Sequence, residues 1–439
     1  MRSRARIFLA AFAFFLFPSL AFADLEEYLR KPEPEFAWSL KDTNDQAGDR
    51  TYNLQFVSQN WQGITWRHEL QVYRPKGATP NRTMFLWING GSPRSAHALI
   101  GMELARKIGA PVAFLYNIPN QPLLEDNLYE DNLIAETFVR YLKTKDENWP
   151  LLFPMVKSVV KAMDVLQAFA GGDSNWKEPV ERFIVSGLSK RGWTTWLTAA
   201  ADKRVGAIAP MVIDTLNMGA QMPKQIEAFG AFSERLQPYV KRGLLPIPQT
   251  PEGRHLLSMV DPWSYRERFS MPKFIVNGSN DFYWVTDALN LYWKDLPGDK
   301  WVLYVPNTGH DLLQRNPASM NRLLNGVAAF TRHQMSGKPM PALKWNYNQN
   351  GRTLRLTVDA SAAPEAARIW LAEAPDRDFR TATWRERPAE ISGGKIVGEV
   401  SAPEKGYVAF FGELDYDDQG MAYQLSTQIR IIGAPAKAD

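Results

Sequence analysis

The sequence contains no cysteine and only five histidines among its 439 residues. The absence of cysteine excludes disulfide bonds, thiolate metal sites and a cysteine nucleophile. No two histidines have the spacing of a metal-binding pair, so we expect neither a metal nor a cofactor. Hydrophobic residues make up 45 % of the chain. This is enough to build one large domain and a second, small one.

A strong excess of charge is also missing. The formal net charge is +4, from 51 basic and 47 acidic residues. Arg2, Arg4 and Arg6 lie in the first 23 residues, which contain no acidic residue, so the rest of the chain is close to neutral. It has no dense stripe of Lys and Arg, and we therefore expect no binding of nucleic acid.

Residues 1–23 have the three parts of a cleavable signal peptide. A basic start precedes an apolar run, Ile7 to Phe17, and the segment ends on Ala21-Phe22-Ala23. The alternative, a transmembrane anchor, needs roughly 20 apolar residues, which is more than this run provides. We predict cleavage before Asp24, export to the periplasm or secretion, and no integral membrane segment after cleavage.

Continuous apolar runs alternate with stretches of helical spacing through residues 24–335. Continuous apolar strands are typical of a mostly parallel sheet that helices cover on both faces. We therefore predict one α/β domain here, with strands in the runs 83–88, 110–116, 182–186, 207–213, 272–277 and 301–305.

The interval 217–265 interrupts this rhythm with amphipathic sequence rich in Met, Phe, Tyr and Pro. We expect a helical cap insertion above the carboxyl edge of the sheet, where ligands bind in such folds. A long crossover helix with loops is the alternative. Beyond a linker at 336–341, residues 340–439 alternate as short strands, which predicts a small β-sandwich-like domain. We expect the chemistry of the α/β domain not to depend on this second domain.

The segment Gly187-Leu188-Ser189-Lys190-Arg191-Gly192 joins an apolar strand directly to a helix. A nucleophile elbow needs this arrangement, with a small residue two positions before the serine. The pattern here is G-x-S-x-x-G, with the second glycine one position later than usual. The alternative is that Ser189 only caps the helix.

Two further strands end in polar loops that carry Asp281 and His310. The order Ser189, Asp281, His310, each after a separate strand, is that of an α/β-hydrolase triad. In such a triad His310 takes the proton of Ser189, and Asp281 orients the imidazole. Asp261 is the alternative acid, although an Asp before Pro commonly opens a turn.

Lys190 supplies a backbone amide directly after the serine, and we expect Gly90 and Gly91 to supply a second one, which together would form an oxyanion hole. A simple turn at the glycines is the alternative. Lys190 and Arg191 place two cations at a helix N-terminus, where the dipole disfavours them. We weigh two explanations, a salt bridge to structural carboxylates and contact of Arg191 with an anionic substrate group.

The segment 187–200 and the motifs at 118–122, 149–157, 210–214 and 305–308 resemble the PhoPQ-activated pathogenicity-related protein family. The resemblance implies an α/β-hydrolase fold, secretion and a triad on Ser189, Asp281 and His310. The G-x-S-x-x-G segment with its basic residue also resembles that of glucuronoyl esterases.

These observations predict a secreted serine hydrolase that cleaves an ester bond, rather than an amide or peptide bond, through an acyl-serine intermediate. Its substrate would be a small molecule or derive from a saccharide or peptide. The alternatives are a non-catalytic ligand-binding protein on the same scaffold, because a fold alone does not fix function, and a glucuronoyl-esterase-like carbohydrate esterase.

Overall fold

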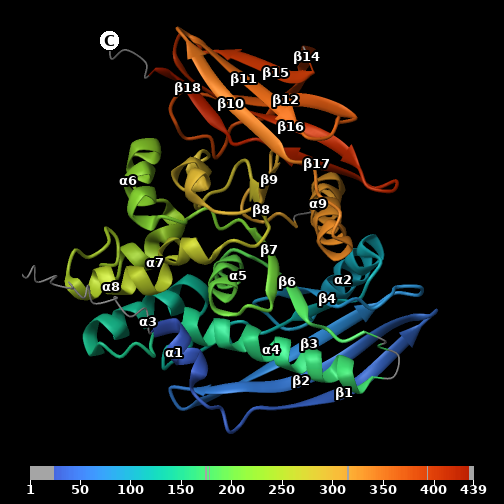
Figure 1. Ribbon diagram of the computed structural model, residues 1–439. Coiled ribbons are helices and arrows are strands. Elements are labelled where there is room, and N and C mark those ends of the chain that lie inside the picture. Colours follow the sequence, from blue (N-terminus) through green and yellow to red (C-terminus); the bar gives the residue numbers. More distant parts are fainter. Residues whose placement is uncertain (1–23, 174–175, 177, 314–315, 393, 435–439) are drawn as a thin grey trace, which may run out of the picture.

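The computed structural model describes residues 24–434 except 174–175, 177, 314–315 and 393 (Figure 1). The predicted signal peptide, residues 1–23, lies outside the described residues. Within the described part of the chain, no helix has both the length and the apolar character needed to cross a membrane.

A long mixed sheet has at its centre the parallel strands β5-β4-β6-β7-β8-β9, preceded by the antiparallel strands β1-β2-β3. Each apolar run that was predicted to be a strand lies in this centre, which confirms the mostly parallel sheet. The strands are β1 (Ala37–Gln46), β2 (Asp49–Trp61), β3 (Ile64–Arg74), β4 (Thr83–Ile88), β5 (Val112–Leu115), β6 (Arg182–Leu188), β7 (Val205–Met211), β8 (Lys273–Gly278) and β9 (Lys300–Val305).

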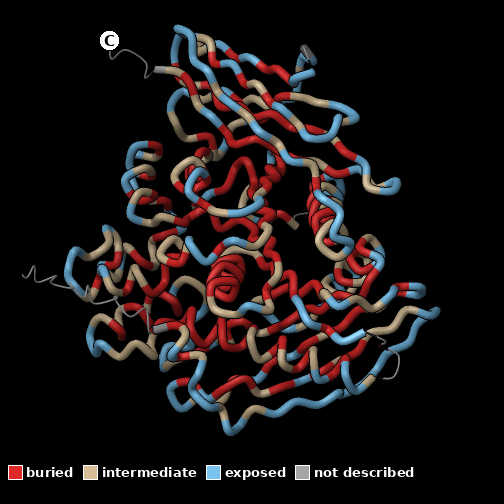
Figure 2. The backbone as a smooth tube through the Cα atoms, viewed as in Figure 1, coloured by how far each residue is buried: buried red, intermediate tan, exposed pale blue. Residues whose placement is uncertain are grey.

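Helices cover both faces of the sheet, and this explains why its central strands are apolar throughout. In β4, Leu86 packs in the hydrophobic cluster that includes α3, α4 and α5, whereas Phe85 packs in the cluster that includes α2 and α9. Figure 2 shows the buried residues concentrated in the central strands and α5, whereas β1 is exposed. The helices are α1 (Asp24–Arg30), α2 (Ser95–Ile108), α3 (Glu130–Thr144), α4 (Leu152–Gly172), α5 (Lys190–Ala201) and α9 (Pro317–Ser336).

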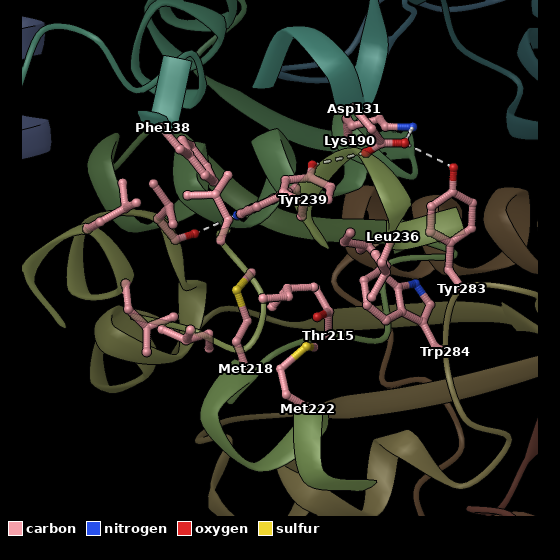
Figure 3. A pocket seen from close by; sticks show the side chains of 18 of the residues that line it. Asp131, Phe138, Lys190, Thr215, Met218, Met222, Leu236, Tyr239, Tyr283 and Trp284 are labelled. Carbon is pink, nitrogen blue, oxygen red and sulfur yellow. Dashed lines mark hydrogen bonds and ion pairs between the residues drawn. The ribbon is translucent and has the colours of Figure 1, made fainter. Parts of the chain in front are cut away.

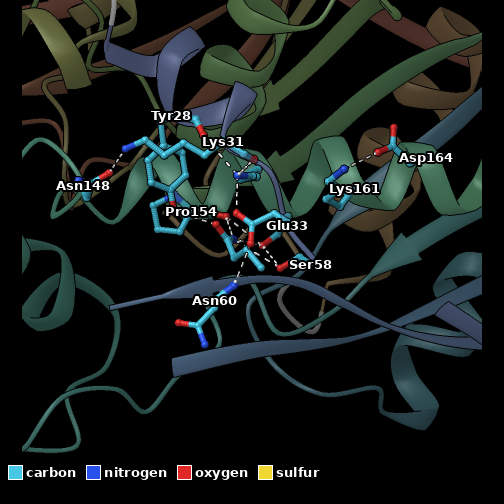
Figure 4. A network of polar contacts seen from close by, with 12 residues as sticks. Tyr28, Lys31, Glu33, Ser58, Asn60, Asn148, Pro154, Lys161 and Asp164 are labelled. Carbon is cyan, nitrogen blue, oxygen red and sulfur yellow. Dashed lines mark hydrogen bonds and ion pairs between the residues drawn. The ribbon is translucent and has the colours of Figure 1, made fainter. Parts of the chain in front are cut away.

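A buried polar network fixes the first described residues to α4 (Figure 4). The ammonium group of Lys157, 1 % exposed, donates to the carboxylate of Glu33 and to the backbone carbonyls of Tyr28, in α1, and Lys31, just after it. Nearby, Oγ of Ser58 lies 2.9 Å from Nε2 of His68. Both residues are at most 2 % exposed, and burial lowers the pKa of His68 to about 4. This second serine–histidine pair is therefore a structural contact that no substrate can reach.

The interval 217–265, between β7 and β8, folds as short helices rather than as one long crossover helix. These elements pack beside α3 and α5. They are α6 (Met218–Phe229), η1 (Glu234–Leu236), α7 (Gln237–Val240), α8 (Pro251–Val260) and η2 (Pro262–Arg268). The short 3₁₀ turns η3 (Ala288–Leu291) and η4 (Trp293–Asp295) follow β8.

Among the described residues after α9, the strands form two antiparallel arrays, β10-β11-β15-β14 and β17-β16-β12-β13 with β18 beside β16. The second array continues the main sheet, because Ser426 of β17 pairs with Val302 of β9. These strands are β10 (Leu343–Asn350), β11 (Thr353–Ala360), β12 (Ala366–Ala374), β13 (Arg385–Pro388), β14 (Glu390–Ser392), β15 (Lys395–Ser401), β16 (Gly406–Asp417), β17 (Ala422–Ser426) and β18 (Arg430–Ala434).

Candidate active site

Ser189 stands in the sharp turn between β6 and α5, with φ 55° and ψ −123°. A positive φ is uncommon and strained for a residue other than glycine, and a nucleophile elbow is a turn of this strained kind. Gly187 is needed because an added Cβ would lie 2.7 Å from Cβ of Arg191. Gly192 is needed as well, since its Cβ would lie 2.8 Å from Cγ2 of Ile213. The spacing G-x-S-x-x-G therefore follows from the close packing of α5 on the strand ends.

His310 and Asp281 form a hydrogen-bonded series with Ser189. Oγ of Ser189 lies 2.8 Å from Nε2 of His310, and the serine side chain makes no capping bond to α5. Nδ1 of His310 lies 2.8 and 3.1 Å from the two carboxylate oxygens of Asp281. An ionised carboxylate can only accept, so the ring proton is on Nδ1 and Nε2 faces the serine as an acceptor. The structure thus brings the three sequence-predicted residues together.

Tyr283 contacts both Asp281 and His310. Its backbone N–H donates to Oδ1 of Asp281 at 2.7 Å. Its ring packs against the imidazole of His310, with centroids 4.2 Å apart. Side-chain exposure is 8 % for Asp281 and 22 % for His310, so the ring is accessible while the acid behind it is buried.

The loops that carry Asp281 and His310 are held against each other. The N–H of Asn280 donates to the carbonyl of Thr308 at 3.1 Å, and the hydroxyl of Ser279 accepts from the N–H of Asn307 at 2.9 Å. An added Cβ on Gly278 would lie 2.3 Å from the carbonyl oxygen of Thr308. Only glycine at this position lets the loops approach so closely.

A loop from the C-terminal region binds both of these loops. Nδ2 of Asn280 lies 2.7–3.3 Å from three carbonyl oxygens in residues 379–382. The side chain of Asn307 exchanges two hydrogen bonds with the backbone of Trp384, at 2.7 and 2.9 Å. Residues 379–384 therefore touch the supports of the acid and of the histidine, which the sequence did not predict.

Asp261, the alternative acid, lies in the cap and supports its helices. Its oxygens accept from the backbone N–H groups of Trp263 at 2.9 Å and Met218 at 2.8 Å. Burial raises the pKa of Asp261 to about 7, although these hydrogen bonds act in the opposite direction. The structure pairs His310 with Asp281 and places Asp261 at the start of η2.

The predicted oxyanion groups lie on two segments. Lys190 is the first residue of α5, where a helix presents free backbone N–H groups. Gly90 and Gly91 follow β4, and the N–H of Asn117 donates to the carbonyl of Gly91 at 3.2 Å. The guanidinium of Arg191 packs on Gly90 so closely that an added Cβ would lie 1.8 Å from Nη2. Arg191 thus supports the glycine loop from behind.

The two cations after the serine are paired with carboxylates of α3. The guanidinium of Arg191 binds both oxygens of Glu130, at 2.6 and 2.7 Å, and its Nε donates to the carbonyl of Ile118 at 2.6 Å. Burial alone would raise the pKa of Glu130, but the charges of Arg191 and Lys190 outweigh it and lower the pKa to about 2. This is the arrangement that the salt-bridge explanation expected, and Arg191 is not among the described residues that line the pocket beside Ser189.

Lys190 binds the neighbouring carboxylate, Asp131, at 2.8 Å. The hydroxyls of Tyr239 and Tyr283 donate to the two oxygens of Asp131, each at 3.0 Å. Figure 3 shows these three donors converging on Asp131 at the edge of a pocket. The cap, α3 and the Asp281 loop are thereby joined at one carboxylate.

The pocket lies between Ser189 and the cap and encloses about 100 Å³. Its walls are mostly apolar (Figure 3). The cap contributes Met218, Met222, Leu236 and Leu256 to it, among others. No group of three His, Asp or Glu side chains that could hold a metal occurs among the described residues.

Residues 25–380 match the sequence profile of the PhoPQ-activated pathogenicity-related proteins. The chain belongs to this family. The assignment confirms the resemblance found in the sequence. The chain is also similar to the autocrine proliferation repressor protein A of Dictyostelium discoideum, to which it is 31 % identical over 439 residues. The similarity covers 91 % of this chain and 87 % of that relative.

Solved structures show the fold of this family member. Acetyl xylan esterase 1 from Thermoanaerobacterium sp. superposes with a TM-score of 0.51 at 14 % identity, over 71 % of this chain and 93 % of the esterase. A glucuronoyl esterase from Solibacter usitatus gives 0.43 at 12 % identity, over 71 % and 91 %. At such low identity the first similarity establishes the α/β-hydrolase fold alone.

The sequence did not predict the carboxylates that lie beside Ser189, His310 and Asp281. Glu130 and Asp131 come from a helix about 60 residues before the serine, and the pattern at 130–143 indicated only a helix. The one available signal was the pair of cations at the start of α5, which required carboxylate partners without naming them.

Proposed function

We propose that this protein is an exported serine hydrolase that cleaves carboxylic esters. The observation that carries the proposal is the series Ser189–His310–Asp281, with hydrogen-bond distances of 2.8 Å on both sides of the imidazole. A strained serine aimed at the acceptor nitrogen of a carboxylate-oriented histidine has the arrangement of an activated nucleophile.

The reaction begins when Nε2 of His310 takes the proton of Ser189 and Oγ attacks the ester carbonyl carbon. The carbonyl oxygen becomes an oxyanion, which the amide of Lys190 and an amide at Gly90 or Gly91 stabilise. Protonated His310 then donates to the departing alkoxide, and an acyl-serine remains. Water, deprotonated by His310, then attacks the acyl carbon. The bond from this carbon to Oγ breaks as His310 returns the proton to Oγ, which releases the acid and free Ser189.

Export is part of the proposal because of the signal-like residues 1–23. Helix α1 begins at Asp24, and Leu25 and Tyr28 of this helix are 2 % and 6 % exposed. Cleavage before Asp24 would leave the first described helix and its buried side chains intact. The N-terminus of the mature protein, isolated from the periplasm and measured by mass spectrometry, tests this point: a chain that starts at Met1 would contradict it.

The central experiment is labelling with a fluorophosphonate, which reacts with activated serines. We expect one adduct, located on Ser189 by peptide mapping, and loss of at least about 1000-fold in ester hydrolysis in Ser189→Ala. Ser58→Ala is the matched control, because Ser58 also hydrogen-bonds a histidine but is buried. Labelling should persist in this control. A folded wild-type protein without adduct would contradict the proposal.

A non-catalytic role is the second candidate. The name of the Dictyostelium relative describes repression of proliferation and no hydrolysis. A binding protein on this scaffold has no need for the strained φ of Ser189 or for the Asp281–His310 pair. Absence of labelling together with intact folding would favour this candidate, whereas an adduct on Ser189 would exclude an inert site.

A further inference from the structure

The pocket beside Ser189 has a chemistry that the proposed reaction leaves unexplained. Its lining combines Ser189 and Lys190 with apolar side chains from α6, η1 and α8, including Met222, Leu236 and Leu256. These three side chains are 4–8 % exposed, and the wall of the pocket is almost entirely apolar. An apolar pocket favours an apolar group of the substrate.

The position of the pocket relative to the triad indicates which part of an ester enters it. The leaving oxygen must receive a proton from Nε2 of His310, so the alcohol lies on the histidine side. The pocket is lined by Ser189 and by Lys190, whose amide would bind the oxyanion, and His310 is not among the described residues that line it. The group that enters the pocket is therefore the acyl chain.

Charged acyl groups are poor candidates for this pocket. Among the described residues that line the pocket, Lys190 is the one cation. Lys190 and its neighbour Arg191 are each already bound to a carboxylate of α3, at 2.8 and 2.6 Å. An acidic acyl group would meet Asp131, which also lines the pocket. The cations at the start of α5 thus hold α3 against the nucleophile elbow and provide no free positive charge to an acid.

The size of the pocket limits the chain. A dry cavity of about 150 Å³ holds a six-carbon ring such as benzene. The present cavity encloses about 100 Å³, which corresponds to a flexible chain of roughly four to six carbons.

We propose that the cap pocket is an acyl-binding pocket that selects esters of unbranched, uncharged fatty acids of about four to six carbons. The inference rests on the proposed function, because the acyl chain is placed by the reaction at Ser189. Since each buried methylene strengthens binding by roughly threefold to fourfold, several together should give at least about a tenfold preference for hexanoate over acetate.

The experiment compares kcat/KM for p-nitrophenyl acetate, butyrate, hexanoate and decanoate. We expect a maximum at butyrate or hexanoate. In Met222→Trp the larger side chain fills the pocket, and the hexanoate-to-acetate ratio should fall by about tenfold. In Met222→Ala the pocket is longer, and the maximum should move toward decanoate. These ratios do not depend on the fraction of folded enzyme, because both substrates report on the same active molecules.

Ile226→Trp is the matched control, since Ile226 lies on the same helix and is 43 % exposed. Its ratios should equal those of the wild type. A wild-type preference for acetate or for an ester with a charged acyl group, such as a hemisuccinate, or unchanged ratios in both Met222 variants, would overturn the inference. The fluorophosphonate adduct on Ser189 is a separate readout: with it, such results reject the acyl pocket only, and without it they reject the proposed hydrolase.

Discussion

The side chain of Asn280 joins the loop of Asp281, the proposed catalytic acid, to the C-terminal region, and its removal offers the sharpest test of that connection. Asn280 precedes Asp281 in the chain and is 8 % exposed. Its amide nitrogen donates to the carbonyl of Ala382 at 2.7 Å and is shared between those of Phe379 and Arg380, at 3.2 and 3.3 Å. Asn280→Ala deletes these bonds and leaves carbonyl oxygens without a donor.

The expected loss of stability can be estimated from these contacts. The amide nitrogen has two hydrogens, so it makes the equivalent of two neutral hydrogen bonds, worth about 1 kcal/mol each. An unpaired buried carbonyl adds about 1–2 kcal/mol. Asn280→Ala should therefore lower the free energy of unfolding by about 3–4 kcal/mol, measured by urea denaturation. Because a shift of about 1 Å in a catalytic group can cost 100-fold, kcat should fall by about 10- to 100-fold.

A matched asparagine separates a positioning effect from general loss of stability. The Nδ2 of Asn290 donates to the carbonyl of Ile429 at 2.9 Å, and its Oδ1 accepts from Gln428 at 2.7 Å. Asn290 also joins the C-terminal region to the α/β domain, but it is nine residues beyond Asp281, on η3. Asn290→Ala should lose similar stability and keep kcat. Equal kcat values in the two variants, at a temperature where both are folded, would refute a role of Asn280 in positioning Asp281.

The remaining predictions concern three carboxylates, those of Asp281, Asp261 and Asp214, and one cation, Arg191. Asp281→Asn should reduce kcat by at least about 1000-fold in steady-state assays, and Asp261→Asn should leave it near the wild-type value, because only Asp281 contacts His310. Arg191→Gln should lower the free energy of unfolding by about 1–2 kcal/mol, because Glu130, 37 % exposed, loses its bidentate partner and keeps Lys190 at 3.5 Å. The loss of rate should be equal on matched neutral and acidic esters; a selective loss on acidic esters would assign Arg191 to the substrate. Burial raises the pKa of Asp214 from 3.8 to about 7, so its contribution to stability is present below pH 4 and lost as the pH rises to 7. Asp214→Asn should remove that loss and gain up to about 4 kcal/mol on the wild type at pH 7 in urea denaturation; parallel pH curves would contradict this.

The parts of the fold that the sequence predicted are those specified by short segments. The run 83–88 is apolar on both faces because helices cover both faces of β4, and a local pattern is enough to reveal this. The positions of Ser189, Asp281 and His310 after separate strands likewise follow from local patterns and from chain order. Their catalytic roles stay a prediction until the labelling experiment is done.

The parts that the sequence did not predict depend on contacts between distant segments. The partner of Arg191 is Glu130, 61 residues away, and nothing in either segment names the other. Likewise, the cap sequence indicates buried apolar side chains at Met222 and Leu256, but not the space that they leave unfilled. Such a space is a small difference between large packed volumes, and a linear pattern carries no information about it.

The alternating pattern of the C-terminal strands predicted the antiparallel arrays that the structure has, but it carried no information about how closely they join the α/β domain. The contacts join the C-terminal strands closely to the α/β domain. One hydrophobic cluster extends from Leu303 of β9 to Phe410 of β16, so the core is continuous. The carboxylate of Glu413, which is fully buried, binds Arg322 of α9 and Arg368 of β12. Removal of one partner of a buried ion pair is strongly destabilising, since the other charge is left in an apolar environment. Truncation at residue 340 would uncover this core and remove the loop that holds Asn280. We therefore expect the loops of Asp281 and His310 to lose part of their support when residues 340–439 are removed.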